Sequence, residues 1–175
     1  MLLHYLGVNM GTAAVTRIQS HTNATKAIVA AGLACGIMDY TAACVTWWLR
    51  ARVTPARIGQ SIASGLLGPR SFHGGYGTAL LGFSIHFLIA FTAATVFYLA
   101  SRKLRFMTEH FLVAGVLYGV AVYTFMYWVV MPLSAVRRGP FSLELTILAI
   151  VTHIFCVGLP IAIAVRKFGG EPSHA

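Results

Sequence analysis

Four long apolar stretches alternate with short polar segments along this chain. They cover about residues 27–49, 77–100, 111–134 and 143–165, and charged or turn-forming residues separate them. About 20 apolar residues in a helix cross the ~30 Å hydrocarbon layer of a bilayer, so each stretch has the length of a membrane span. The pattern therefore predicts an all-α, polytopic membrane protein with four transmembrane helices.

The two ends of the chain differ from this central region. Residues 1–26 contain scattered glycines and hydroxyl residues, with Arg17 as the only Lys, Arg, Asp or Glu before Lys26. Their short apolar run precedes the basic residues, unlike that of a secretory signal, so we expect a mobile N-terminal tail without cleavage. Residues 168–175 are predicted to form a C-terminal tail. The four-helix transmembrane domain then covers residues 27–167.

The first loop contains the signals of a further short helix over residues 55–67. Thr54 is a favourable N-cap residue, Pro55 suits the first helical position, and Gly68 can end the helix. Apolar residues recur within it at helical spacing, with polar residues in other sectors. This pattern is typical of an amphipathic helix in the membrane interface, although a re-entrant segment or a plain surface helix would have the same pattern.

The amino-acid composition also indicates a membrane protein, and it favours lipid over nucleic acid as the partner. Hydrophobic residues make up 58% of the chain, charged residues 10%, and the mean hydropathy is +0.77, values unlike those of a soluble domain. The formal charge of +9 comes from basic residues scattered through every polar segment. Nucleic-acid binding would require a basic face, whereas scattered juxtamembrane cations suit anionic lipid headgroups. We therefore expect the lipid bilayer as partner and no nucleic acid.

The basic loop residues give a weak orientation signal. Arg102, Lys103 and Arg105 directly follow one span, and Arg166 and Lys167 directly follow another, on the side that also carries both termini. Because Lys and Arg near span ends favour the cytoplasmic side, we expect a multi-pass protein with both termini in the cytoplasm.

Small residues occur at helical spacing within the spans. Pairs separated by four positions let helix backbones approach closely in membranes. The predicted helix-packing residues are Gly32, Gly36, Gly82, Gly115 and Gly119.

Asp39 is the most informative residue, because it lies near the middle of the first span with no other charge around it. An ionised side chain at the bilayer centre costs about 3 kcal/mol on insertion scales, so such a residue faces a partner or a water-filled cavity. At ~1.5 Å rise per residue, Asp39, His86, Tyr123 and His153 each lie roughly 13–15 Å below the same surface. The sequence thus predicts a polar cluster to which all four spans contribute.

Several roles for this cluster remain open. It could order the bundle through interhelical hydrogen bonds, as in a structural or accessory subunit. It could instead be a proton-responsive centre around Asp39, coupled to passage of a solute. A b-type haem held by His86 and His153, or a divalent metal held by Asp39 and both histidines, are further alternatives. We expect neither cofactor nor metal, since no close ligand spacing and no other redox signature accompany these residues.

The chain contains no catalytic constellation such as a carboxylate pair, a nucleophile elbow or an HExxH motif, so we do not expect an enzyme. Four helices are few for a solute path, so a transport role would require a homo-oligomer.

Certain segments indicate a family. Residues 57–68, the Gly-Gly pair at 74–75, residues 86–90 and residues 130–134 resemble those of small YagU-like proteins of the bacterial inner membrane, which carry a domain of unknown function. The resemblance covers about residues 27–167. It implies a four-helix inner-membrane protein and carries no activity or binding residues.

Overall fold

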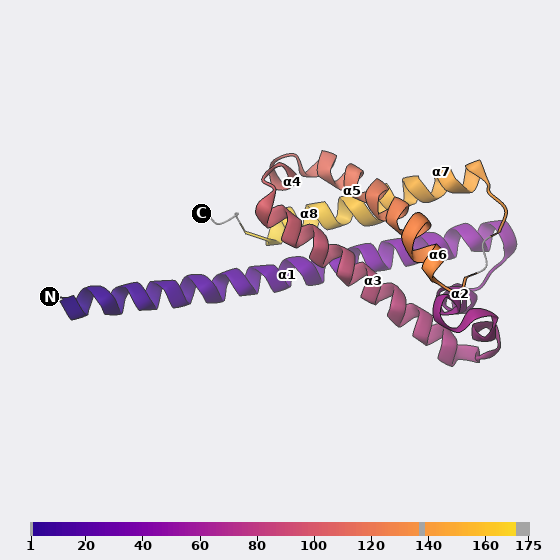
Figure 1. Cartoon of the computed structure of the whole chain (residues 1–175), viewed down its shortest axis with the longest axis horizontal. Coiled ribbons are helices and arrows are strands. Elements are labelled where there is room, and N and C mark those ends of the chain that lie inside the picture. Colours follow the sequence, from indigo (N-terminus) through magenta and orange to yellow (C-terminus); the bar gives the residue numbers. More distant parts are fainter. Residues whose placement is uncertain (1, 137–138, 171–175) are drawn as a thin grey trace.

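A computed structural model describes residues 2–136 and 139–170, with side chains from residue 23 onward (Figure 1). The described chain is helical and contains no β-strand. Its segments are α1 (Leu2–Ala51), α2 (Pro55–Leu67), η1 (Gly68–His73), α3 (Gly75–Lys103), α4 (Phe106–Glu109), α5 (Phe111–Phe125), η2 (Met126–Val130), α6 (Met131–Leu133), α7 (Leu143–Thr152), η3 (His153–Gly158) and α8 (Leu159–Phe168).

Four stretches of helix are long and apolar enough to cross a membrane: Asn23–Ala51, Gly75–Lys103, Phe111–Leu133 and Leu143–Phe168. The third combines α5, η2 and α6, and the fourth combines α7, η3 and α8; we call these the third and fourth spans. Each begins or ends within a few residues of its predicted range. The prediction of an all-α, four-span membrane protein is confirmed.

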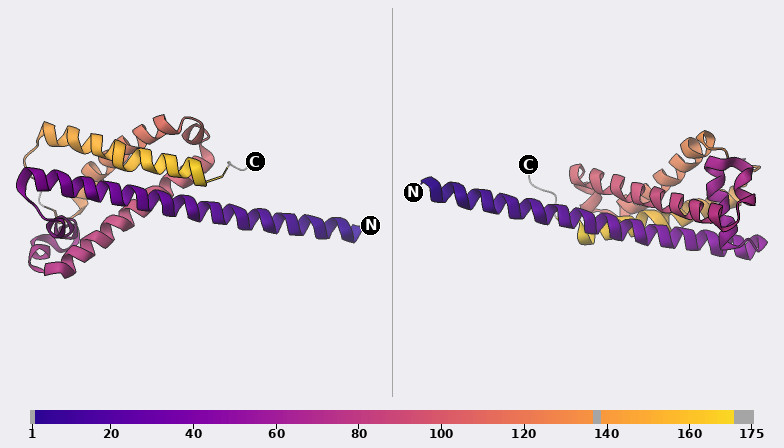
Figure 2. Two further views of the ribbon diagram at one scale, coloured as in Figure 1. Left: turned by 180° about the vertical axis from the view of Figure 1, so that it is seen from behind. Right: turned by 90° about the horizontal axis from the view of Figure 1, so that it is seen from below.

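Helix α1 is longer than its span. It begins at Leu2, contains no proline that would break it, and its N-terminal part extends past the other helices (Figures 1 and 2). Residues 2–26, expected to form a tail, are therefore helical. Their mobility remains a prediction. Of the predicted C-terminal tail, residues 171–175 lie outside the described residues.

The four spans are closely packed in one half of their length and separate in the other. A core around the fully buried Phe97, Ile161 and Val165 joins α1, α3, α5 and α8 in the half that contains the start of the first span and the end of the fourth. Figure 2 shows α7 and α8 running alongside α1, while α3 and α5 cross obliquely. No described residue of α1 beyond Gly36 is buried, and none of α7 is. The second half of the bundle is therefore open.

Glycines bring α1 and α3 together at the boundary between these halves. A Cβ atom on Gly32 would lie 2.3 Å from the ring of Phe91, and one on Gly36 would lie 2.8 Å from the ring of Phe87. Both distances are far below normal contact, so each phenylalanine ring occupies the space that a side chain on α1 would need.

Helix α2 has the predicted bounds, and the Thr54 hydroxyl accepts a hydrogen bond from the Arg57 amide at 3.3 Å. It packs on the first turns of α3, where a Cβ atom on Gly82 would lie 1.7 Å from the Gly59 carbonyl oxygen. The buried side of α2 includes Gln60, whose amide donates a hydrogen bond to the Gly75 carbonyl at 3.0 Å. Ile58 lies on this side too, among small and polar residues. The apolar residues at the end of α2 face outward.

The third and fourth spans each contain a π-helical segment, η2 and η3. Pro132 follows η2 and Pro160 follows η3 by two residues. A proline lacks the N–H that would bond to the carbonyl four residues earlier, and its ring clashes with that carbonyl, so a wider turn before the proline relieves the clash. The same two spans touch closely, because a Cβ atom on Gly158 would lie 2.0 Å from the Gly115 carbonyl oxygen.

Candidate functional site

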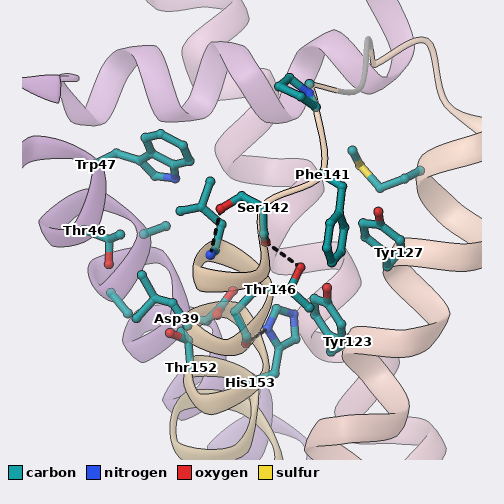
Figure 3. A pocket seen from close by; sticks show the side chains of 18 residues that line it. Asp39, Thr46, Trp47, Tyr123, Tyr127, Phe141, Ser142, Thr146, Thr152 and His153 are labelled. Carbon is teal, nitrogen blue, oxygen red and sulfur yellow. Dashed lines mark hydrogen bonds between the residues drawn. The ribbon is translucent and has the colours of Figure 1, made fainter. Parts of the chain in front are cut away.

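The open half of the bundle contains a cavity of about 540 Å³ between α1, the third span and the fourth span. The segment 139–142 before α7 also contributes to it. Figure 3 shows the side chains that line the cavity, and its wall is mostly apolar. The polar and aromatic residues among them are Asp39, Thr46, Trp47, Tyr123, Tyr127, Phe141, Ser142, Thr146, Thr152 and His153.

Asp39 faces this cavity together with Ala43 and Thr46, which follow it on the same side of α1. Its side chain is half-buried and makes no hydrogen bond or ion pair with any of the described residues. An unpaired carboxylate in a low-dielectric site is costly, so a water molecule, a proton or a ligand has to compensate it.

His153 lines the cavity at the start of η3. Its Nδ1 atom lies 2.8 Å from the carbonyl oxygen of Ala149, and since a carbonyl only accepts, Nδ1 is the protonated nitrogen. The Nε2 atom of the neutral ring is then left as a proton acceptor. The ring of Tyr123 packs edge to face against the imidazole, with 5.6 Å between the ring centroids. The ring of Tyr127 stacks on that of Tyr123, with 5.9 Å between their centroids. These three rings form one wall of the cavity.

His86 lies elsewhere. Its Nε2 atom is 2.9 Å from the Gly36 carbonyl oxygen of α1, and its ring packs at 5.3 Å from that of Tyr40. It does not line the cavity. Of the four residues in the predicted cluster, the structure therefore brings Asp39, Tyr123 and His153 to one cavity and places His86 at the contact between α1 and α3.

The separation of His86 from the cavity concerns two alternatives, a haem held by His86 and His153 and a divalent metal held by Asp39 and both histidines. Axial ligands of one haem have to face a common slot, whereas His153 lines the cavity and the Nε2 atom of His86 is engaged by a backbone carbonyl. Within the described residues, no group of three or more His, Cys, Asp or Glu side chains is placed to hold a metal ion.

An ion pair joins the two helices that flank this end of the cavity. Arg50, near the end of α1, contacts Glu144 in the first turn of α7 at 2.6 Å. Ser142 caps α7 by accepting a hydrogen bond from the Leu145 amide at 3.4 Å, and its carbonyl accepts one from Thr146 at 2.9 Å (Figure 3). The ion pair links the end of α1 to the start of the fourth span, while the Ser142 contacts order the first turn of α7.

Sequence reasoning missed most of the aromatic lining. Helical spacing could have found two of its members, since Trp47 follows Asp39 by eight positions and Tyr127 follows Tyr123 by four. Phe141 lies in a loop, where no periodicity applies.

Comparison of the chain with family models, with curated proteins and with solved structures finds no match in any of the three. Any functional inference therefore depends on the chemistry of the cavity.

Proposed function

We propose that this is a proton-linked protein of the bacterial inner membrane, in which Asp39 gains and loses a proton as a small solute enters and leaves the cavity. The observation that carries the proposal is the position of Asp39. Its carboxylate is the one acidic group lining the cavity and has no partner among the described residues.

The surroundings of Asp39 suit proton exchange. Tyr123 faces the cavity from α5 and His153 from η3. No Lys or Arg is among the described residues that line the cavity. A proton or a cationic solute can then neutralise it in turn.

The proposal also covers the orientation of the protein in the membrane and its oligomeric state. With both termini in the cytoplasm, the open half of the bundle faces the periplasm, because it contains the end of the first span and the start of the fourth. The three spans around this cavity enclose it only partly, which favours a homo-oligomer for passage across the whole membrane.

The test is the pH dependence of thermal unfolding for wild type and Asp39→Asn in detergent. Asn has no proton to gain, so the difference in Tm between the two proteins is expected to change with pH. The matched control is Glu109→Gln, which removes a carboxylate that pairs with Arg105 far from the cavity. A difference in Tm between wild type and Asp39→Asn that stays constant from about pH 4 to about pH 9 would contradict the proposal.

A structural role is the second candidate, and a specific observation favours it. His86 bonds to the Gly36 carbonyl across α1 and α3, and the Tyr118 hydroxyl donates to the Ala93 carbonyl across α3 and α5 at 2.7 Å. These are interhelical bonds of the kind that order a membrane bundle. Asp39 makes no such bond, which is why the proton-linked role ranks first.

A further inference from the structure

We infer that the cavity binds hydrophobic organic monocations, such as aromatic or quaternary ammonium and phosphonium ions, and that one cation enters in exchange for the proton of Asp39. This inference rests on the proposed function and specifies its solute class. In the exchange, the neutral carboxylic acid and the free cation become a carboxylate–cation pair and a released proton, so charge is conserved.

The single carboxylate in the cavity favours a ligand with one positive charge. Asp39 supplies the one carboxylate among the described lining residues, which include no Lys or Arg; the other titratable groups there are the His153 imidazole and the hydroxyls of Tyr123 and Tyr127. A bound monocation would neutralise this carboxylate in a mostly apolar site, where an unpaired charge is costly. An anion would add to the negative charge, and a dication would leave one charge unpaired.

The aromatic wall selects an organic cation with delocalised or shielded charge. Trp47 of α1, Tyr123 of α5, Tyr127 of η2 and Phe141 of the segment before α7 present rings to the cavity from different sides (Figure 3), where Trp47 lies on one side and the other three rings lie together on the opposite side. Aromatic faces attract quaternary ammonium and related ions through the ring quadrupole, most strongly where water is excluded.

The size and polarity of the cavity exclude a small hydrated ion. A volume of about 540 Å³ lies within the range of sites for drug-sized ligands, whereas a bare metal ion needs several oxygen ligands close together. Ser142 and Thr146 already bond to the backbone of α7 or to each other. Thr46, Thr152 and the two tyrosines add hydroxyl oxygens, and Asp39 supplies the only carboxylate oxygens among the described lining residues.

The first arm of the test measures binding of tetraphenylphosphonium to the full-length protein in detergent by equilibrium dialysis. Tetraphenylborate, an anion of the same shape, controls for hydrophobic partition. We expect saturable binding of the cation only, a loss of about tenfold or more in affinity for Asp39→Asn, and wild-type affinity for Glu109→Gln. Asp39→Glu keeps the charge and is expected to keep binding, which separates loss of charge from loss of folding.

The second arm tests the aromatic wall with two neighbouring tryptophans. The two side chains are about equally exposed, but Trp47 lines the cavity and Trp48 does not. Trp47→Leu is expected to weaken tetraphenylphosphonium binding about threefold to tenfold, and Trp48→Leu to leave it unchanged. Equal effects of the two substitutions would overturn the assignment of the cation to this cavity.

The third arm counts protons by calorimetry in buffers of different ionisation enthalpy. At a pH where Asp39 is protonated, one proton is expected to leave for each cation bound, and the affinity falls about tenfold for each further unit of pH decrease. Equal cation binding by wild type and Asp39→Asn would overturn the inference while leaving the proposed function intact. A pH-independent difference in Tm between these two proteins would overturn the proposed function whatever the binding result.

Discussion

Substitution of Gly82 by alanine should force α2 and α3 apart. The new Cβ atom would lie 1.7 Å from the Gly59 carbonyl oxygen and 2.9 Å from the Ala63 amide nitrogen, both of which are backbone atoms of α2. Ordinary contact begins near 3.4 Å, so the helices have to separate by more than 1 Å. Overpacking of this kind costs about 1–3 kcal/mol, and the displacement here places the expected cost at the upper end.

Gly77→Ala on the same helix is the matched control, because nothing lies within 4 Å of its added Cβ atom. Alanine is the better helix former by about 1 kcal/mol, so this variant should be as stable as wild type or slightly more stable. For Gly82→Ala the same propensity gain offsets only part of the clash, which leaves a net loss of about 2 kcal/mol, or about 4–8 °C in Tm.

The assay is unfolding followed by circular dichroism in mixed micelles, with amide hydrogen exchange over residues 55–67 as a local readout. Gly82→Ala should lower stability and speed exchange in α2, whereas Gly77→Ala should do neither. If both variants unfold like wild type and α2 exchanges at the same rate in all three proteins, the close contact between α2 and α3 is refuted.

Three further outcomes follow from individual contacts. Thr54→Ala removes the N-cap of α2 and should destabilise the protein by about 1 kcal/mol, measured by the same unfolding assay. Tyr118→Phe deletes the hydrogen bond to the Ala93 carbonyl and should also cost about 1 kcal/mol, whereas an unchanged Tm would show that this bond contributes nothing. The Arg50–Glu144 pair is largely exposed, so a double-mutant cycle should find a small coupling that high salt abolishes.

The spans and the short helix could be read from the sequence because their signals are local. Apolar length alone locates the four spans, and Thr54 with Pro55 marks the start of α2 as the structure has it. The buried side of α2 could not be read in this way. Its burial of Gln60 depends on the fit of Gly59 against Gly82, which is a property of two helices in space.

The sequence predicted which spans contribute to the candidate cluster, but not the direction of each side chain. Residue counts gave a common level for four polar residues, and the structure places three of them around one cavity. His86 points to α1 at Gly36 instead, because the crossing of α3 over α1 sets its direction. The π-helical segments were not predicted, although Pro132 and Pro160 are the sequence signals for them.

The most direct test of the central claim is a pH titration of the Asp39 carboxyl group itself. Asp39 is the only aspartate in the chain, so cell-free synthesis with aspartate labelled with carbon-13 at the carboxyl carbon gives one resonance for this residue. In lipid nanodiscs, this resonance should move between the positions of the ionised and protonated forms within about pH 4 to 9, and tetraphenylphosphonium should move it toward the ionised form. A resonance that stays fixed across this range, with and without the cation, would contradict a proton-exchanging Asp39.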